Sequence, residues 1–306
     1  MIFYRIVLFV TLLLIVISVD PSRAAQVFPP LDQCFDQDLQ VGLETSLNSL
    51  HLDTAVQQKR LSVTLVDVTD PQEPRLAEVN GNYMMYAASL PKIAILLGAF
   101  ERIAQGDLEW NPAIEETLIR MIRNSSNTAA TEMLNQVGKE YLADLLQSPR
   151  YRLYDPQKNG GLWVGKEYSK NPAWRRDPLH HLSHGATALQ VARFYYLLDT
   201  GRLVSPESSR EMKEILGQPA IHHKFVKGLE QNRPGAIVFR KSGTWKEFHS
   251  DSALVEHRGR RYIAVALAKS PQGGEWLSRL ITALDDLIVR SPSRLLRLAG
   301  NREALQ

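Results

Sequence analysis

Hydrophobic positions near residue 60 follow the pattern of a β-strand. The segment Leu61–Val68 (LSVTLVDV) is rich in β-branched residues and partly alternates apolar with polar positions. Residues 70–74 (DPQEP) supply turn chemistry, and a second short apolar segment, Arg75–Val79, comes directly after them. Two such segments around a turn predict a β-hairpin.

From Ser89 onward the hydrophobic spacing becomes that of a helix. The apolar residues that recur at this spacing are Ile93, Leu96, Leu97, Phe100 and Ile103. Alanines fill much of the remaining surface and few positions are charged. A helix with so few charges is expected to be central and buried.

Start and stop signals predict further helices in the middle of the chain. At Asn111-Pro112 and at Ser205-Pro206, a capping side chain is followed by proline at the first helical position. Glycines stand where helices are expected to end, at Gly106, Gly138 and Gly201. The irregular stretch 147–184 fits neither period and is predicted to be a long ordered loop, a feature that is often functional.

Strand patterns return after about Pro234. They cover 237–239, 252–256 and 262–268, and an amphipathic helix is predicted over about 275–289. The order strand, helices, strand, helix predicts an α/β plus all-α fold, in which an antiparallel sheet from both chain ends is flanked by helices and carries an inserted helical lobe. We expect the α/β lobe to include residues of about 40–83 and 220–290, and the helical lobe residues of about 84–219.

The first residues have the pattern of a secretory signal peptide. Arg5 supplies a positive charge, Ile6–Val19 is apolar but shorter than the about 20 residues that span a bilayer, and Ser22-Arg23-Ala24 offers a cleavage site. We therefore expect residues 1–24 to be removed, 25–290 to form the catalytic domain and 291–306 a tail. This predicts a periplasmic or secreted protein with no stable membrane anchor after cleavage.

Composition narrows the function classes. The 306 residues carry a net charge of only +3, which does not indicate the dense basic surface of a nucleic-acid binder. Cys34 is the single cysteine, so a disulfide within the chain and a cysteine-rich metal site are excluded. His180, His181 and His184 lack an accompanying carboxylate cluster, and we expect no metal site and no cofactor. A monomer is the default expectation.

Three short motifs carry the chemistry, and each has an ordinary alternative when taken alone. In Ser89-Leu90-Pro91-Lys92 the spacing brings a hydroxyl near an amine, which becomes a base if burial lowers its pKa. The alternative is a capping serine beside a solvated lysine. Ser125-Ser126-Asn127 lies between two predicted helices, where Ser125 or Asn127 is also a helix cap. Lys241-Ser242-Gly243-Thr244 is also a strand end with a turn glycine.

Taken together and in this order, the motifs correspond to the set S-x-x-K, S-D-N and K-T-G of serine β-lactamases and penicillin-binding proteins, with serine in place of the aspartate and of the threonine. The segments 83–89 (YMMYAAS) and 121–130 (MIRNSSNTAA) extend the likeness. The chain resembles the class A β-lactamase family, within the penicillin-recognising serine hydrolases, over roughly Leu61–Val289.

The resemblance implies a role for each motif residue. Ser89 attacks the amide carbonyl and forms an acyl-enzyme, with Lys92 as base or proton relay, and Ser125 passes a proton to the leaving nitrogen. Asn127 binds the substrate side-chain amide, while the backbone N–H groups of Ser89 and Thr244 form the oxyanion hole. Lys241 and Ser242 bind the substrate carboxylate, and Gly243 allows the strand to approach closely.

Two departures from the family pattern matter. Ser126 stands where class A enzymes have aspartate, which puts the subclass in doubt. Glu167 and Asn171 have the four-residue spacing of the pair that holds the hydrolytic water in class A enzymes, but the flanking residues 160–166 differ and the loop lies further along the chain than expected. Glu167 is therefore either the deacylating base or a surface glutamate.

The resemblance implies an acyl-enzyme-forming serine hydrolase, first of all a class A-like β-lactamase that hydrolyses the β-lactam amide, as in antibiotic resistance. The alternatives are a D-alanyl-D-alanine peptidase or related penicillin-binding hydrolase, a slowly deacylating penicillin-binding sensor module, and a hydrolase of an unrelated ester or amide. The expected partner is a small β-lactam or an acyl-D-Ala-D-Ala peptide.

Overall fold

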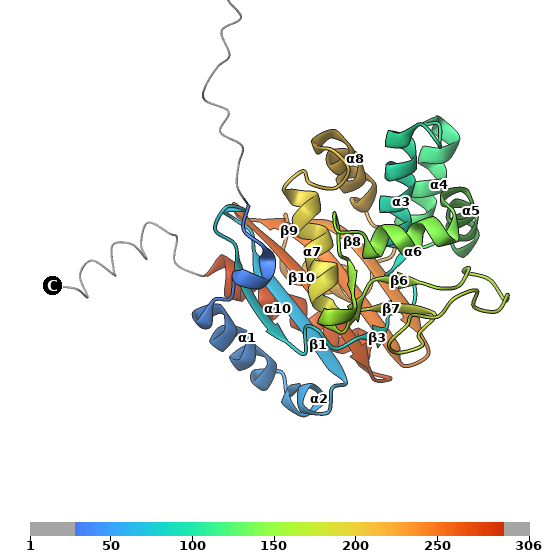
Figure 1. Cartoon of the computed structure of the whole chain (residues 1–306). Helices are drawn as coiled ribbons and strands as arrows, with labels where there is room; N and C mark the ends of the chain where they lie inside the picture. The colour runs from blue at the N-terminus through green and yellow to red at the C-terminus, as the bar shows by residue number, and fades with distance from the viewer. Residues whose placement is uncertain (1–27, 291–306) are drawn as a thin grey trace, which may run out of the picture.

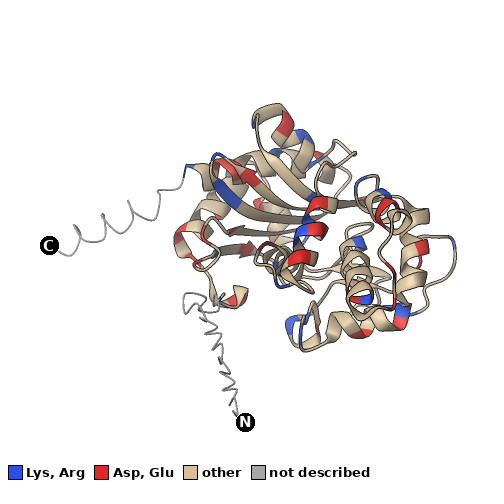
Figure 2. Cartoon of the chain, turned by 90° about the horizontal axis from the view of Figure 1, so that it is seen from above, with Lys and Arg blue, Asp and Glu red and all other residues tan. Residues whose placement is uncertain are grey.

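The computed structural model of the chain describes residues 28–290. The predicted signal peptide, residues 1–24, and the predicted tail, residues 291–306, lie outside the described residues. Within residues 28–290, none of the helices is both long and apolar enough to cross a membrane. Basic and acidic residues are interspersed over the ribbon (Figure 2).

An antiparallel sheet with the strand order β2-β1-β10-β9-β8 lies at the centre of the fold (Figure 1). Its strands are β1 Leu61–Asp67, β2 Arg75–Val79, β8 Ile237–Trp245, β9 Phe248–His257 and β10 Arg260–Lys269. The predicted hairpin is β1 and β2, which pair directly. Leu61 of β1 faces Ala268 of β10, so the sheet is assembled from both ends of the chain, as predicted.

Alternate residues of β10 point into two separate hydrophobic cores, as the two-residue period of a strand requires. Ile263 and Val265 pack in the core that includes α7 Ala188–Asp199. Tyr262 and Ala264 pack in the core that includes α1 Gln37–Ser49 and α10 Gly273–Val289. Figure 1 shows α7 on one face of the sheet and α1 with α10 on the other. The other helices around this second core are α2 Asp53–Gln57 and α9 Phe225–Asn232.

The middle of the chain is mostly helical, as its capping signals predict. Its helices are α3 Lys92–Gln105, α4 Pro112–Ile122, α5 Asn127–Val137, α6 Lys139–Gln147, α7 and α8 Pro206–Leu216. The Asn111 side chain accepts hydrogen bonds from two backbone N–H groups at the start of α4, and the Ser205 hydroxyl accepts one at the start of α8. The predicted fold class, an antiparallel sheet with helices and an inserted helical lobe, is confirmed.

The buried helix α3 begins at Lys92 and not at Ser89, where the sequence placed it. Leu90 precedes Pro91, and the proline ring clashes with the residue before it when that residue adopts the helical conformation. Residues 89–91 therefore form a turn whose carbonyls accept the first N–H groups of α3, with Lys92 N bonded to Ser89 O at 3.3 Å. Ala88 enters this turn with a positive φ of 51°.

The stretch 147–184, predicted as a loop, contains short strands and one short helical turn. The small elements of this stretch are β4 Tyr154–Asp155, η2 Pro156–Lys158, β5 Gly160–Gly161 and β6 Trp163–Val164. Two further short strands are β3 Met85–Tyr86, earlier in the chain, and β7 His184–Ala186, which begins where the stretch ends. Strands β3, β7 and β6 form a small sheet. Because β3 ends just before the Ser89 turn, this sheet holds the loop 165–183 beside that turn.

Candidate active site

Lys92 is a buried lysine at the first position of α3. Its Nζ donates a hydrogen bond to the backbone oxygen of Ser125 at 2.6 Å and another to Oδ1 of Asn127 at 2.8 Å. Burial lowers the pKa of Lys92 to about 7. At neutral pH a substantial fraction of Lys92 is therefore the neutral amine, as a base near Ser89 requires.

Ser125 and Asn127 belong to the junction between α4 and α5, where the sequence left a capping role open. The cap of α5 is Ser126, whose hydroxyl accepts from Ala129 N at 3.2 Å. Ser125 has a positive φ of 55°, a backbone conformation that L-residues seldom adopt. The side chains of Ser125 and Asn127 are thus available to the two lysines of the site and do not close the helix.

Lys241 extends from β8 toward the same junction. Its Nζ donates to the Ser125 hydroxyl at 2.8 Å and to the Ser242 carbonyl at 2.7 Å. Complete burial, with a further contribution from the charge of Lys92, holds the pKa of Lys241 well below that of an exposed lysine. Two lysines whose charged forms are both disfavoured thus meet at the residue predicted to relay protons.

Strand β8 lies directly against the Ser89 turn at Gly243. A Cβ atom at this position would be 2.3 Å from the carbonyl oxygen of Ala87 and 2.6 Å from the backbone nitrogen of Ser89. No side chain fits there without moving backbone atoms, so glycine permits the contact. Ser250 of β9 adds a hydrogen bond from its hydroxyl to Ala87 O at 2.8 Å.

Lys224 is a site residue that the sequence reasoning missed. It precedes α9, and its buried Nζ donates to Gly243 O at 2.6 Å, to Thr244 Oγ1 at 2.8 Å and to Ser250 O at 3.1 Å. Burial lowers the pKa of Lys224 to about 8. No spacing signal marks this lysine, because it reaches β8 only through the folded loop before α9.

A cavity of about 850 Å³ opens in front of these groups. Ser89, Asn127 and Thr244 line it, and so does the loop 166–173 with Glu167. The structure therefore brings Ser89 and the motif residues Asn127 and Thr244 to one cavity, with Lys92, Ser125 and Lys241 bonded behind it.

Glu167 faces this cavity from the loop but is already bonded. One carboxylate oxygen forms an ion pair with Lys139 of α6, and the other accepts from Asn171 Nδ2 at 2.8 Å. The hydrogen bond from Lys139, followed by that from Asn171, lowers the pKa of Glu167. The E-x-x-x-N spacing noted in the sequence thus corresponds to a real contact between Glu167 and Asn171.

Tyr168, the next residue, is the part of the loop that covers Lys92. The Lys92 Nζ lies 4.5 Å from the centre of the Tyr168 ring. On its other side the ring packs on His184, with centroids 4.3 Å apart, and burial raises the pKa of the phenol well above its usual value. Nothing in the sequence singled out this tyrosine.

His184 fixes the loop. Its Nε2 is 3.0 Å from the carbonyl oxygen of Lys166, and burial lowers its pKa to about 4. Within residues 28–290, no group of three or more His, Cys, Asp or Glu side chains is placed to hold a metal ion.

Three aromatic side chains, those of Tyr86, Trp245 and Phe248, also line the cavity. Tyr86 lies 5.3 Å from Trp245 and 5.5 Å from Phe248, measured between ring centroids. Trp245 is 48% exposed although it is a large apolar residue. Trp245 lines the cavity beside Thr244.

Solved structures with the same fold were found by comparison. A β-lactamase from Sphaerobacter thermophilus superposes with a TM-score of 0.64 at 17% identity, covering 83% of this chain and 99% of that one. PBP-A superposes with a TM-score of 0.61 at 17% identity, covering 84% and 97%. A class A β-lactamase representative from Bacteroides cellulosilyticus gives 0.61 at 16%, covering 81% and 98%.

A search of curated proteins found no match to this sequence. The sequence does match the Beta-lactamase enzyme family over residues 43–115 and 111–290, which include all three motifs and the loop that carries Glu167. This match confirms the resemblance inferred from the motifs and the prediction of a serine hydrolase. The chain therefore belongs to the beta-lactamase enzyme family.

Proposed function

We propose that this hydrolase opens β-lactams by forming an acyl-enzyme on Ser89. Lys92, as the neutral amine, takes the proton of the Ser89 hydroxyl while Oγ attacks the lactam carbonyl. The proton then passes to the lactam nitrogen through the Ser125 hydroxyl, which already accepts a hydrogen bond from Lys241. The ring amide breaks, and its carbonyl carbon stays bonded to Ser89.

The approach of β8 to the Ser89 turn supports an oxyanion hole made by two backbone N–H groups, those of Ser89 and Thr244. Such donors stabilise the negative charge that develops on the carbonyl oxygen, and one of them is worth about 3 kcal/mol of barrier. Lys241 and Ser242 would bind the substrate carboxylate, and Asn127 the amide of the acyl side chain.

Hydrolysis of the acyl-enzyme is assigned to Glu167, with Asn171 as the second group that orients water. Both residues line the cavity that contains Ser89. The carboxylate must take a proton from water while one of its oxygens is bonded to Lys139. Because this bond stabilises the ionised carboxylate and weakens it as a base, we expect deacylation to be the slower half of the reaction.

One observation carries the proposal: the three motifs, far apart in the chain, are joined by hydrogen bonds at one place. Lys92 Nζ to Asn127 Oδ1 and Lys241 Nζ to Ser125 Oγ are both 2.8 Å. The solved structures with this fold include a PBP-A variant whose name states an acyl-enzyme complex with penicillin G, which supports β-lactams as the substrate class.

Time-resolved intact mass spectrometry of the protein with benzylpenicillin tests the proposal. We expect an adduct of one penicillin that forms and decays, and no adduct on Ser89→Ala. In Glu167→Ala the adduct should persist. Labelling that survives in Ser89→Ala would refute the nucleophile, and equal decay in Glu167→Ala would refute the assigned base.

A second candidate function is a D-alanyl-D-alanine peptidase that releases penicillin slowly. The observation in its favour is the loop: Glu167 is tied to Lys139, and the Tyr168 ring covers Lys92. An adduct that persists in the unmodified protein, together with release of D-alanine from an acyl-D-Ala-D-Ala peptide, would favour this candidate.

The place of action is also a proposal. The signal-peptide pattern in residues 1–24 favours the periplasm or secretion, and we propose that the protein acts there as a monomer. Mass analysis of the exported protein should give a chain that starts near Ala25. A full-length chain retained in the cytoplasm would contradict export.

A further inference from the structure

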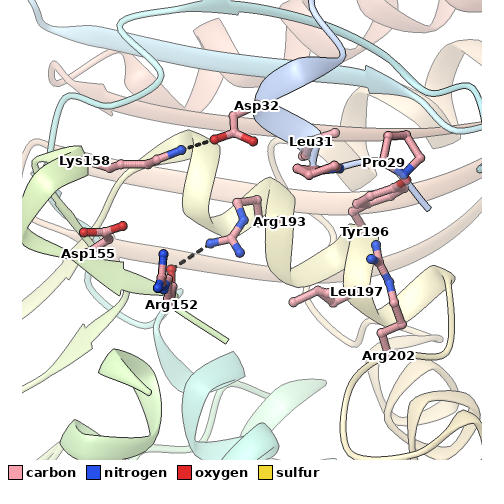
Figure 3. Close-up of a pocket in the computed structure, with 11 residues that line it drawn as sticks. Pro29, Leu31, Asp32, Arg152, Asp155, Lys158, Arg193, Tyr196, Leu197 and Arg202 are labelled. Carbon is pink, nitrogen blue, oxygen red and sulfur yellow. Dashed lines mark hydrogen bonds and ion pairs between the residues drawn. The ribbon is translucent and has the colours of Figure 1, made fainter. Parts of the chain in front are cut away.

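A second cavity, of about 220 Å³, lies apart from the active site. It is enclosed by η1 Leu31–Gln33, by the segment 152–158 and by one side of α7 (Figure 3). It has no lining residue in common with the active-site cavity. Whatever it binds would therefore not occupy the place of the β-lactam.

Positive charge predominates around this cavity. Its charged lining residues are Arg152, Lys158, Arg193, Arg202, Asp32 and Asp155, which give four positive and two negative charges. Lys158 and Asp32 neutralise each other as an ion pair across one end. None of the three arginines forms an ion pair with any residue of the range 28–290 in the structure. An excess of two positive charges thus remains.

Two of the arginines are held in place before any ligand arrives. Arg193 extends from α7, and its guanidinium donates to the carbonyl oxygens of Arg152 at 2.7 Å and Tyr151 at 3.1 Å. Figure 3 shows this guanidinium between Arg152 and the Lys158–Asp32 pair. Arg202 donates from Nε to Thr200 Oγ1 at 2.9 Å. Fixed guanidinium groups lose little freedom when they bind an anion.

Burial and neighbouring charges make an added anion favourable here. Burial lowers the pKa of Arg193, the charges of Asp32 and Asp155 oppose this shift, and the charges of Arg202 and Arg152 add to it. The two aspartates offset the repulsion among the arginines in part, but an excess of two positive charges remains because Asp32 also pairs with Lys158. Asp155 uses one oxygen to accept from Gln157 N at 2.9 Å, at the start of η2. A bound anion would reduce this repulsion.

The other end of the cavity is apolar. Pro29, Leu31 and Leu197 line it, together with Tyr196 (Figure 3). The Arg202 guanidinium lies 4.9 Å from the centre of the Tyr196 ring, so its flat face is covered while it borders the cavity. A ligand that combines a negative group with a compact apolar group matches the two ends.

From this arrangement we propose that the cavity is a binding site for a small organic anion, a phosphate or carboxylate borne on a compact apolar group, at Arg152, Arg193 and Arg202. The site is separate from the β-lactam site. A phosphate monoester, with close to two negative charges, compensates the excess charge most fully.

Isothermal titration calorimetry with phenyl phosphate tests the proposal, with benzoate and phenol as partial ligands. We expect saturable one-site binding of phenyl phosphate, weaker binding of benzoate and none of phenol. Arg152→Gln should weaken phenyl phosphate binding about tenfold or more, because it removes a charge-assisted contact yet keeps the backbone carbonyl that holds Arg193. Arg279→Gln, on α10 across the sheet, is the matched control and should bind as the unmodified protein does.

A second arm separates this site from the active site. The affinity for phenyl phosphate should not change in Ser89→Ala, nor in Glu167→Ala that carries the penicillin adduct on Ser89 after free benzylpenicillin has been removed. Loss of phenyl phosphate binding in the adduct would place the anion in the active site and overturn the proposal. Absence of binding at millimolar phenyl phosphate, or equal binding in Arg152→Gln with a normal circular dichroism spectrum, would also overturn it.

Discussion

Two parts of the active-site cavity differ in how their charged groups are bonded. On the motif side, Lys92 and Lys241 are buried and bonded to Ser125 and Asn127, and the pKa of each lysine is lowered. On the loop side, Glu167 is ionised and bonded to a cation, and its pKa is also lowered. A lowered pKa produces a base from a lysine but weakens a carboxylate as one. In the proposed mechanism, formation and breakdown of the acyl-enzyme would therefore depend on separate groups whose pKa shifts have opposite effects on their strength as bases.

Removal of the Lys92 amine should have the largest effect on the motif side. Lys92→Met keeps much of the apolar stem, and we expect the rate of acylation by benzylpenicillin to fall by about 10³-fold, the usual contribution of a positioned base. Stopped-flow measurement of adduct formation checks this. Lys59→Met, at an exposed lysine that does not line the cavity, is the control and should acylate normally. A loss below tenfold would contradict the assignment of Lys92 as base.

The pH dependence of acylation tests the lowered pKa of Lys92 on the motif side. Because the pKa of Lys92 is lowered to about 7, the reactive neutral amine is lost as the pH falls below that value. We expect the acylation rate to decrease about tenfold per pH unit below pH 7 and to level off above it. Measured rates that stay flat between pH 5 and pH 8 would show that Lys92 does not titrate in this range.

The Tyr168 ring connects the two sides, and its removal should shift that profile. The ring lies 4.5 Å from the Lys92 amine and favours its charged form, so a variant that keeps the amine covered but removes the ring, Tyr168→Leu, should lower the pKa of Lys92 further. We expect the midpoint of acylation to move to lower pH by roughly 0.5–1 unit. Tyr168→Phe keeps the ring and should keep the midpoint. A shift in both variants would point to the hydroxyl instead.

The smallest effect is expected on the loop side. Lys139→Met removes the cation that holds Glu167, so the pKa of the carboxylate should rise toward its ordinary value. A stronger base should speed decay of the penicillin adduct by roughly threefold to tenfold, with unchanged acylation. Lys59→Met, at an exposed lysine that does not line the cavity, is the control. Slower decay in Lys139→Met would mean that Lys139 positions the carboxylate for catalysis.

Much of the fold and of the motif side was predictable because it depends on local signals. The caps at Asn111 and Ser205 and the β1–β2 hairpin act within a few residues, and the structure has them where the sequence predicts them. The start of α3 differed because the Leu90-Pro91 step overrides the hydrophobic pattern.

The rest of the site depends on contacts between distant loops, which no local signal encodes. Lys224 reaches Thr244 only because the loop before α9 folds under β8. Tyr168, and not Glu167, covers Lys92 because the small β3-β7-β6 sheet and the packing of Tyr168 on His184 fix the position of the loop. The E-x-x-x-N spacing identified a loop that lines the same cavity as Ser89, but it did not show that Lys139 would hold the carboxylate.

The pairing of β1 with β10 also constrains the order of folding. Leu61 cannot meet Ala268 until nearly the whole described chain has been synthesised. Contacts between such distant residues slow folding, and until they form β1 has an unpaired edge that invites aggregation. Lys241 likewise joins Ser125 only in the last part of synthesis. We therefore expect a chain truncated before β8 to be inactive and to depend on chaperones for its solubility.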